Sequence, residues 1–189
     1  MVAFFRYSVE DVLNIERTTS GTAAAGIGAR ISYRQEHAGG TLVNTIGVDE
    51  KQIQIPMTFN HPIKELIWVL QINPIYQTGV NKRYEFFDFS NGQDPPGDTM
   101  ESATIRFEGN ERFKRREAFV FRVLQPYQYH TRVPRNFIYV YSFGLKPEEH
   151  QPTGTCNFSK LDSVTLDIIL NECVIQKDTQ CNIYATSYN

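Results

Sequence analysis

The sequence predicts an all-β protein, an antiparallel sandwich of the jelly-roll type. Several segments alternate apolar and polar residues with a period of two, as half-buried strands do. Turn signals rich in Gly, Pro and Asn separate these segments. Aromatic residues make up 13% of the 189 residues, and their rings pack well on a pleated surface. Long connections, above all residues 77–102, favour Greek-key wiring and hence a jelly roll.

The first fifty residues differ from the rest, and we expect a short irregular segment there. Ser8 to Asp11 resembles a helix capping box, and the apolar spacing after it predicts a short helix to about Arg17. Residues 18–29 are small and glycine-rich, which indicates a flexible linker. We expect 18–40 to be the least ordered part. The chain is therefore divided into an N-terminal segment with linker, 1–50, and a jelly-roll domain, 51–189.

The strand pattern runs through the whole second part. Ile53 to Phe59 alternates, and Ile63 to Ile72 is apolar almost throughout, which predicts a strand covered on both faces, although its length also allows a helix. Ile183 begins a last strand that the chain barely completes. Between them, four further runs alternate: Ile105 to Phe107, Phe119 to Val123, Phe137 to Leu145 and Val164 to Leu170.

Charge and hydropathy exclude two classes of function. The formal net charge is −2, whereas nucleic-acid binders normally carry a basic excess, so we expect no direct nucleic-acid partner. The longest apolar run, Leu66 to Leu70, is far shorter than the ~20 residues that span a bilayer. The start of the chain has no basic leader. We expect a soluble protein, made in the cytoplasm and not inserted in a membrane.

The histidines could serve as metal ligands, but their spacing argues against a metal site. A cupin-like site needs two histidines separated by one residue inside a strand, and the sequence has no such pair. His61 and Glu65 have a ligand-like spacing, yet His61 lies in an Asn-His-Pro turn. We interpret the histidines, His130 included, as turn or surface residues and expect no metal.

The segment Glu148-Glu149-His150 contains the residue types of an acid–base cluster. Pro147 and Pro152 bracket it, however, and adjacent carboxylates in a turn are more simply a solvated corner between strands. We therefore expect no catalysis here.

The three cysteines show no paired spacing. Cys156 would need His150 beside it to act as a nucleophile, so a small buried residue is the simpler interpretation. Cys173 and Cys181 are likewise interpreted as free thiols of a reducing compartment. We predict no enzyme and no cofactor.

The run Arg112 to Glu117 is the one basic cluster of the sequence. It could bind phosphate, but in an acidic chain a polar loop with local ion pairs is the simpler interpretation.

Four motifs resemble segments of the major capsid proteins of nucleocytoplasmic large DNA viruses, of the iridovirus, phycodnavirus and mimivirus kinds. They follow one another in the family's order from Asn60 to the end. The first comprises Asn60, His61, Pro62, Ile63, Lys64, Glu65, Leu66, Ile67 and Trp68; the second, Glu111, Arg112 and Phe113 through Glu117; the third, Gln125, Pro126, Tyr127, Gln128, Tyr129, His130 and Thr131; and the fourth, Tyr141 to Asp162, includes Lys146, Pro147, Glu148, Glu149, His150, Gln151, Pro152, Gly154, Cys156, Asn157 and Phe158.

The resemblance implies a structural role for these motif residues and a location in the virion capsid. Family members carry two jelly rolls in tandem and form homotrimers, the pseudo-hexagonal capsomers of an icosahedral shell. The partners would be the chain itself, neighbouring capsomers and minor capsid proteins, and the chain would be a late protein. By this resemblance the chain is the second roll, with its final strand missing, and a fragment or truncated copy, and residues 1–50 are the tail of a first roll or its replacement.

Two other functions stay open from the residues alone. A carbohydrate- or receptor-binding jelly roll could use Tyr127, Tyr129 and Tyr188 as a stacking platform. A cupin-like metalloenzyme would need a bound metal. Glycan binding without oligomers would favour the first, and a stoichiometric metal would favour the second.

Overall fold

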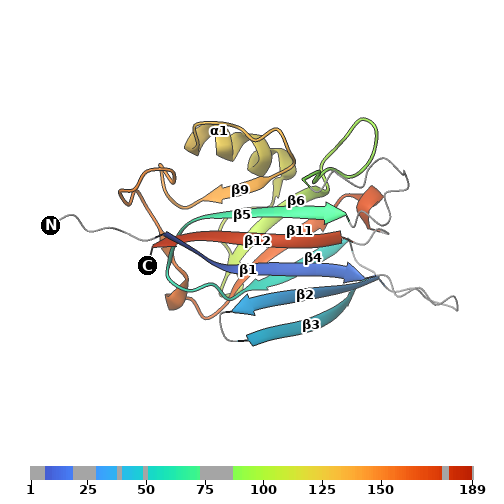
Figure 1. The fold of residues 1–189 in the computed structure, drawn as a ribbon, viewed down its shortest axis with the longest axis horizontal. Helices are drawn as coiled ribbons and strands as arrows, with labels where there is room; N and C mark the ends of the chain where they lie inside the picture. Colours follow the sequence, from blue (N-terminus) through green and yellow to red (C-terminus); the bar gives the residue numbers. More distant parts are fainter. Residues whose placement is uncertain are drawn as a thin grey trace, which may run out of the picture.

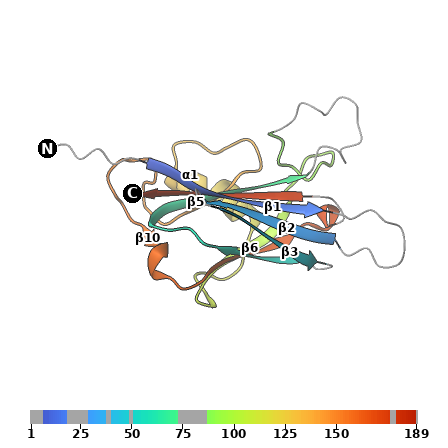
Figure 2. The same cartoon turned by 60° about the horizontal axis from the view of Figure 1, so that its bottom comes forward.

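In the computed structural model the described residues are 7–18, 29–37, 40–48, 51–72, 87–175 and 179–188, the first three ranges by their backbone alone. They form two antiparallel β-sheets that pack as two layers (Figures 1 and 2). The predicted fold class is therefore confirmed. None of the helices among these residues is long and apolar enough to cross a membrane.

The first sheet has seven strands in the order β10-β5-β12-β1-β2-β3, with β9 also paired to β5. In Figure 1, β9 and the helix α1 lie at the top of this sheet and β3 at the bottom. Its strands are β1 (Tyr7–Thr18), β2 (Ala29–His37), β3 (Gly40–Val48), β5 (Pro62–Ile72), β9 (Tyr139–Ser142), β10 (Cys156–Asn157) and β12 (Thr179–Tyr188).

The second sheet has five strands in the order β4-β11-β6-β7, with β8 also paired to β6. Its strands are β4 (Gln52–Met57), β6 (Met100–Phe107), β7 (Asn110–Glu111), β8 (Arg116–Glu117) and β11 (Val164–Leu170). Short helical turns, η3 (Phe158–Lys160) and η4 (Glu172–Val174), flank β11 in the sequence.

The core lies between the two sheets and follows the predicted alternation. Leu66, Trp68 and Leu70 of β5 face Ile105 of β6 and Leu166 of β11 within one buried cluster. Both faces of β5 are largely buried, as its continuous apolar sequence predicts. The predicted strands in β4, β6 and β11 are also confirmed.

The strand predicted at Phe119 to Val123 is wrong. The chain forms a wide helical turn, η2 (Val120–Leu124), which continues as the helix α1 (Gln125–Tyr129) with Pro126 in its first turn. Phe121 is the buried residue, with ring centroids 5.3 Å from Trp68 and 5.8 Å from Phe113. Phe121 thus bridges the first sheet and the edge of the second, and this tertiary contact outweighs a short period-two pattern.

The predicted strand Phe137 to Leu145 is shorter than expected. Only β9 pairs with β5, and the chain turns away at Phe143 and Gly144, whose N–H groups both donate to the carbonyl of Lys64. Leu145 consequently lies outside the sheet and is 71% exposed.

The helix predicted at 8–17 is also wrong, because β1 pairs with β12 on one side and β2 on the other. Two backbone ladders satisfy the N–H and C=O groups of β1, whereas a short helix is marginal without tertiary support. Residues 29–37, expected among the least ordered, form β2, so the N-terminal segment is not irregular in its described part. The linker at 19–28 lies outside the described residues.

The last strand also differs from the prediction. It begins at Thr179, not Ile183, and its ten residues lie between β5 and β1 in the interior of the first sheet.

Candidate functional site

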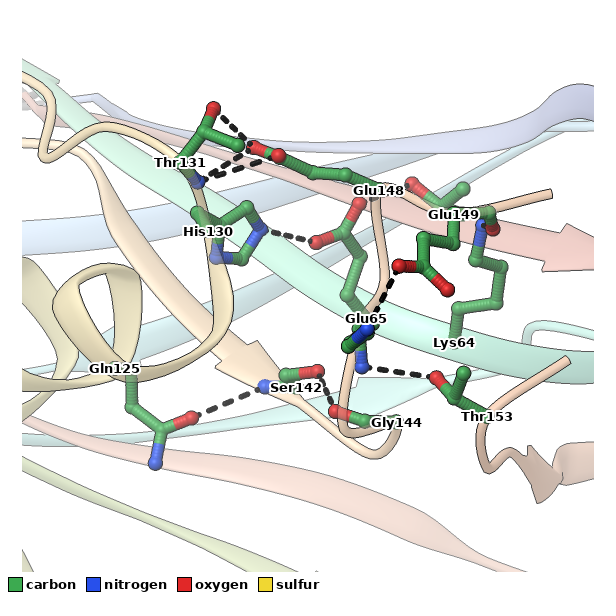
Figure 3. Close-up of polar contacts among 12 residues, drawn as sticks. Lys64, Glu65, Gln125, His130, Thr131, Ser142, Gly144, Glu148, Glu149 and Thr153 are labelled. Carbon is green, nitrogen blue, oxygen red and sulfur yellow. Dashed lines mark hydrogen bonds and ion pairs between the residues drawn. The ribbon is translucent and has the colours of Figure 1, made fainter. Parts of the chain in front are cut away.

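Three of the four motifs meet at the start of β5 (Figure 3). The first motif contributes Lys64 and Glu65 from β5, the third contributes His130 and Thr131 from the end of α1, and the fourth contributes the corner loop 143–154. We call the polar contacts among Lys64, Glu65, His130, Thr131, Glu148 and Glu149 the motif cluster. It joins segments up to 85 residues apart in the sequence.

Glu65 is the centre of the motif cluster. Its Oε2 lies 2.7 Å from Nε2 of His130, and its Oε1 accepts a 3.1 Å hydrogen bond from the hydroxyl of Thr186. The side chains of Glu65 and His130 are 11% and 14% exposed. Each carboxylate oxygen of Glu65 thus has a partner where solvent exposure is low. Glu65 thereby connects β5 with β12 and with the end of α1.

Lys64 holds the corner loop from the other side. Its side chain is buried, its Nζ donates to the carbonyl of Glu149 at 3.2 Å, and the same Nζ lies 5.1 Å from the centre of the Tyr188 ring. Burial lowers the pKa of Lys64, and the neighbouring Glu65 carboxylate opposes this effect. The ammonium therefore binds a backbone carbonyl and an aromatic face within the fold.

The corner loop uses its carboxylates as cross-links. Glu148 accepts hydrogen bonds from the backbone N–H of Thr131 at 3.2 Å and from its hydroxyl at 3.3 Å. Glu149 pairs with Lys146 at 2.9 Å, Pro147 is buried, and His150, Gln151 and Pro152 are exposed. The geometry is that of the predicted corner, but Glu148 is bound to Thr131 instead of being only solvated.

Two glycines let the two sides of the corner approach closely. Gly154 has a φ of +144°, and a Cβ added there would lie 2.9 Å from the carbonyl oxygen of Phe143. A Cβ at Gly144 would lie 2.9 Å from the carbonyl oxygen of Gly154. Only glycine fits both the φ at Gly154 and this backbone contact.

Replacing Gly154 by alanine is therefore expected to lower the free energy of unfolding by about 1–3 kcal/mol, measured by urea denaturation. Gly109→Ala is the matched control, because Gly109 also has a positive φ of +81° but no atom near its added Cβ. It should cost about 1 kcal/mol through backbone strain alone. Equal effects of the two substitutions would contradict the close approach at the corner.

The start of the first motif packs on the end of the fourth. The N–H of His61 donates to the hydroxyl of Ser159 at 2.8 Å, and the N–H of Phe158 donates to the carbonyl of His61 at 3.1 Å. Cys156 pairs with Ile63 across β10 and β5, and burial raises the pKa of its thiol while Arg112 opposes this effect. The half-buried Cys156 is a packing residue, and all three cysteines are free.

The second motif contributes an aromatic contact and an ion pair. Phe113 stacks on Tyr141 with ring centroids 4.9 Å apart. Arg115 lies 3.9 Å from the fully buried Asp167, which Arg106 approaches to 3.0 Å. Arg115 therefore pairs with a residue of β11 that is distant in sequence, whereas the sequence predicted local ion pairs within the loop.

A second polar group was not predicted from the sequence. Asp98 pairs with Arg122 through both carboxylate oxygens, at 2.8 and 3.2 Å, and accepts from the hydroxyl of Tyr139 at 3.2 Å. That hydroxyl also lies 3.2 Å from Oγ1 of Thr99 and accepts from the N–H of Met100. Burial is the main reason why the pKa of the Tyr139 hydroxyl is raised above its usual value. Asp98 lies in a loop that the sequence marks only as a turn, so no periodic signal points to it.

The arrangement does not favour the alternative chemistries. Among the residues that the structure describes, no three His, Cys, Asp or Glu side chains gather as metal ligands would. His61 lies in the turn just before β5, His130 binds Glu65, and His150 is exposed on the corner. Nor do the three tyrosines form one platform, since Tyr127 is 76% exposed whereas Tyr188 lies under Lys64.

A two-layer antiparallel sandwich whose motif side chains cross-link its own loops defines a structural jelly-roll protein. The chain belongs to the family of large eukaryotic DNA virus major capsid proteins. Its residues 36–189 match the sequence model of that family. Members of this family are structural proteins of the virion capsid and not enzymes.

Individual relatives agree with this assignment. The chain is 47% identical over 89 residues to the major capsid protein of Phaeocystis pouchetii virus, across 46% of this chain and 17% of that protein. It is 32% identical over 166 residues to the major capsid protein of Pyramimonas orientalis virus, across 76% of this chain and 37% of that protein. The chain thus spans well under half the length of either relative.

Solved structures show the same architecture. A quasi-atomic model of the PBCV-1 virus capsid matches with a TM-score of 0.56 and 27% identity, across 75% of this chain and 44% of that one. The Faustovirus major capsid protein matches with a TM-score of 0.63 across 96% of this chain and 34% of that one. At 12% identity, the second likeness concerns the fold alone.

Proposed function

We propose that this chain is a structural component of an icosahedral virus shell and acts by self-association. In this proposal it takes the place of the second jelly roll, residues 51–189, in a trimeric, pseudo-hexagonal capsomer. That capsomer contacts neighbouring capsomers and minor capsid proteins. The signature residues of the four motifs fix the fold of the roll and take part in no reaction.

The observation that carries the proposal is the motif cluster. A catalytic or ligand-binding group needs free polar atoms aimed at a cleft, whereas Lys64, Glu65 and Glu148 use theirs on contacts within the chain. Motifs used in this way support a rigid building block. Such a block acts through its outer surfaces, and permanent interfaces between capsid subunits bury about 2,000 Å² or more.

Light scattering on the freshly purified chain tests self-association. We expect trimers or larger species, because a roll that normally packs against other subunits leaves interface surface exposed when isolated. A stable monodisperse monomer of 21.8 kDa at tens of micromolar would contradict the proposal.

A further inference from the structure

One side of the helical segment 118–129 exposes large hydrophobic side chains. Across the part of the chain that the structure describes, six large hydrophobic side chains are exposed, and four of them, Phe119, Leu124, Tyr127 and Val133, fall in this helix and the loop after it. The wide turn η2 explains the first two, because residues five apart share a side in a π-helix. The opposite side carries the buried Phe121.

The same region is strongly basic. Residues 112–135 contain seven Lys or Arg and one acid, Glu117, a formal net charge of +6, and two of the seven, Arg115 and Arg122, pair with carboxylates outside this range. The rest of the chain holds the other 12 of 19 basic and 20 of 21 acidic residues, a net charge of −8. The exposed Arg116 precedes the helix, and the exposed Arg132 and Arg135 follow it. We call Phe119, Leu124, Tyr127, Arg116, Arg132 and Arg135 the helix patch.

The helix patch stands on a fixed support. Arg122 binds Asp98 with two contacts, and Gln125 accepts a 3.2 Å hydrogen bond from the N–H of Ser142. Phe121 packs on Trp68, and Pro126 is buried. Because the buried side is held this firmly, the helix backbone under the patch needs little ordering when a partner binds. Exposed aromatic and arginine side chains are the residue types that anchor protein interfaces.

We propose that the helix patch is the surface through which one copy of this chain contacts an acidic surface of a second copy. The inference rests on the proposed self-association and names the face that performs it. Charge complementarity selects the partner, since the chain outside 112–135 carries the opposite net charge. Two patches cannot face each other, because their arginines repel. The contact is therefore head-to-tail, the kind that closes rings instead of isologous dimers.

Sedimentation velocity on the full chain tests this, at about 0.05 M and about 0.5 M salt, where screening of exposed charges differs strongly. Two variants alter the patch: Tyr127→Ala, and the double substitution Arg132→Glu with Arg135→Glu. Their matched controls are Leu145→Ala, which truncates an equally exposed apolar residue on the corner loop, and Lys160→Glu on η3. All five altered residues are exposed, and unchanged urea midpoints confirm that the variants fold.

We expect the unaltered chain to associate beyond the dimer and more weakly at high salt. Each patch variant should associate about tenfold more weakly, with both controls unchanged. A monomeric unaltered chain would refute the proposed self-association itself, and the inference with it. An unaltered chain that associates as tightly as its patch variants would refute the inference alone. So would loss of binding to anionic phospholipid vesicles in the patch variants with self-association intact, since the patch would then contact lipid.

Discussion

Replacing Tyr139 by alanine is expected to lower the free energy of unfolding by about 3–5 kcal/mol, as large aromatic truncations in cores do. Tyr139 is fully buried, and its ring stacks on Trp68 with centroids 6.1 Å apart. Its hydroxyl donates to Asp98, so the substitution removes packing and also leaves the Asp98–Arg122 pair with one contact fewer. Urea denaturation followed by tryptophan fluorescence measures the loss, because Trp68 reports on this contact.

Two comparisons separate the causes. Tyr139→Phe keeps the ring and should cost only about 1–3 kcal/mol, through the unpaired polar groups around the lost hydroxyl. His150→Ala should change stability by less than about 0.5 kcal/mol, because His150 is exposed on the corner. If His150→Ala were the more damaging change, the assignment of this segment as a corner would be wrong.

Glu65→Ala is the second substitution with a large expected effect, a loss of about 2–4 kcal/mol in the free energy of unfolding. It removes the acceptor of both His130 and Thr186, which then lie in a nearly buried place without it. The measurement is again urea denaturation. Glu101→Ala is the matched control, because Glu101 pairs with Lys51 on the surface and such pairs contribute about 0–1 kcal/mol.

A double-mutant cycle with His130→Ala then tests the contact itself. If Glu65 and His130 act through each other, the double variant should be more stable than the sum of the two single losses indicates, by about 0.5–3 kcal/mol. Strict additivity would mean that the motif cluster does not join β5 to the end of α1.

Local pattern predicts the strands of this fold where one face is buried along the whole strand. β4 alternates throughout, and β11 buries every second residue from Val164 to Leu170, although Asp167 on its other face is buried as well. The same rule fails at Phe119 to Val123, because a five-residue alternation does not distinguish a strand from a helix that buries Phe121 alone. It fails again at β1, whose helical spacing is overridden by pairing with β12 and β2, partners far away in sequence.

The candidate site divides in the same way. Two features of the site are local: the turn at His61, with a φ of +72°, and the corner at Gly154. Asn, Pro and Gly predict both of them from the sequence. The pairing of Glu65 with His130 depends on where α1 ends relative to β5, and that is set by the packing of Phe121 on Trp68. The sequence predicted His130 only as a turn or surface residue, because no local pattern encodes a contact across 65 residues.

The contacts inside the roll show which parts of the molecule remain available for function. Polar motif residues hold the corner and the end of α1, and aromatic rings fill the space between the sheets. The shape of the roll is thus determined internally. Its outer faces, among them the helix patch, are available for other subunits.

Quantitative mass spectrometry of gradient-purified virions, from the virus that encodes this chain, tests the structural role most directly. We predict that peptides from residues 51–189 rank among the abundant virion proteins and stay with the shell when internal proteins are extracted. Absence of these peptides from virions, while they are abundant in infected cells, would contradict a role in the capsid.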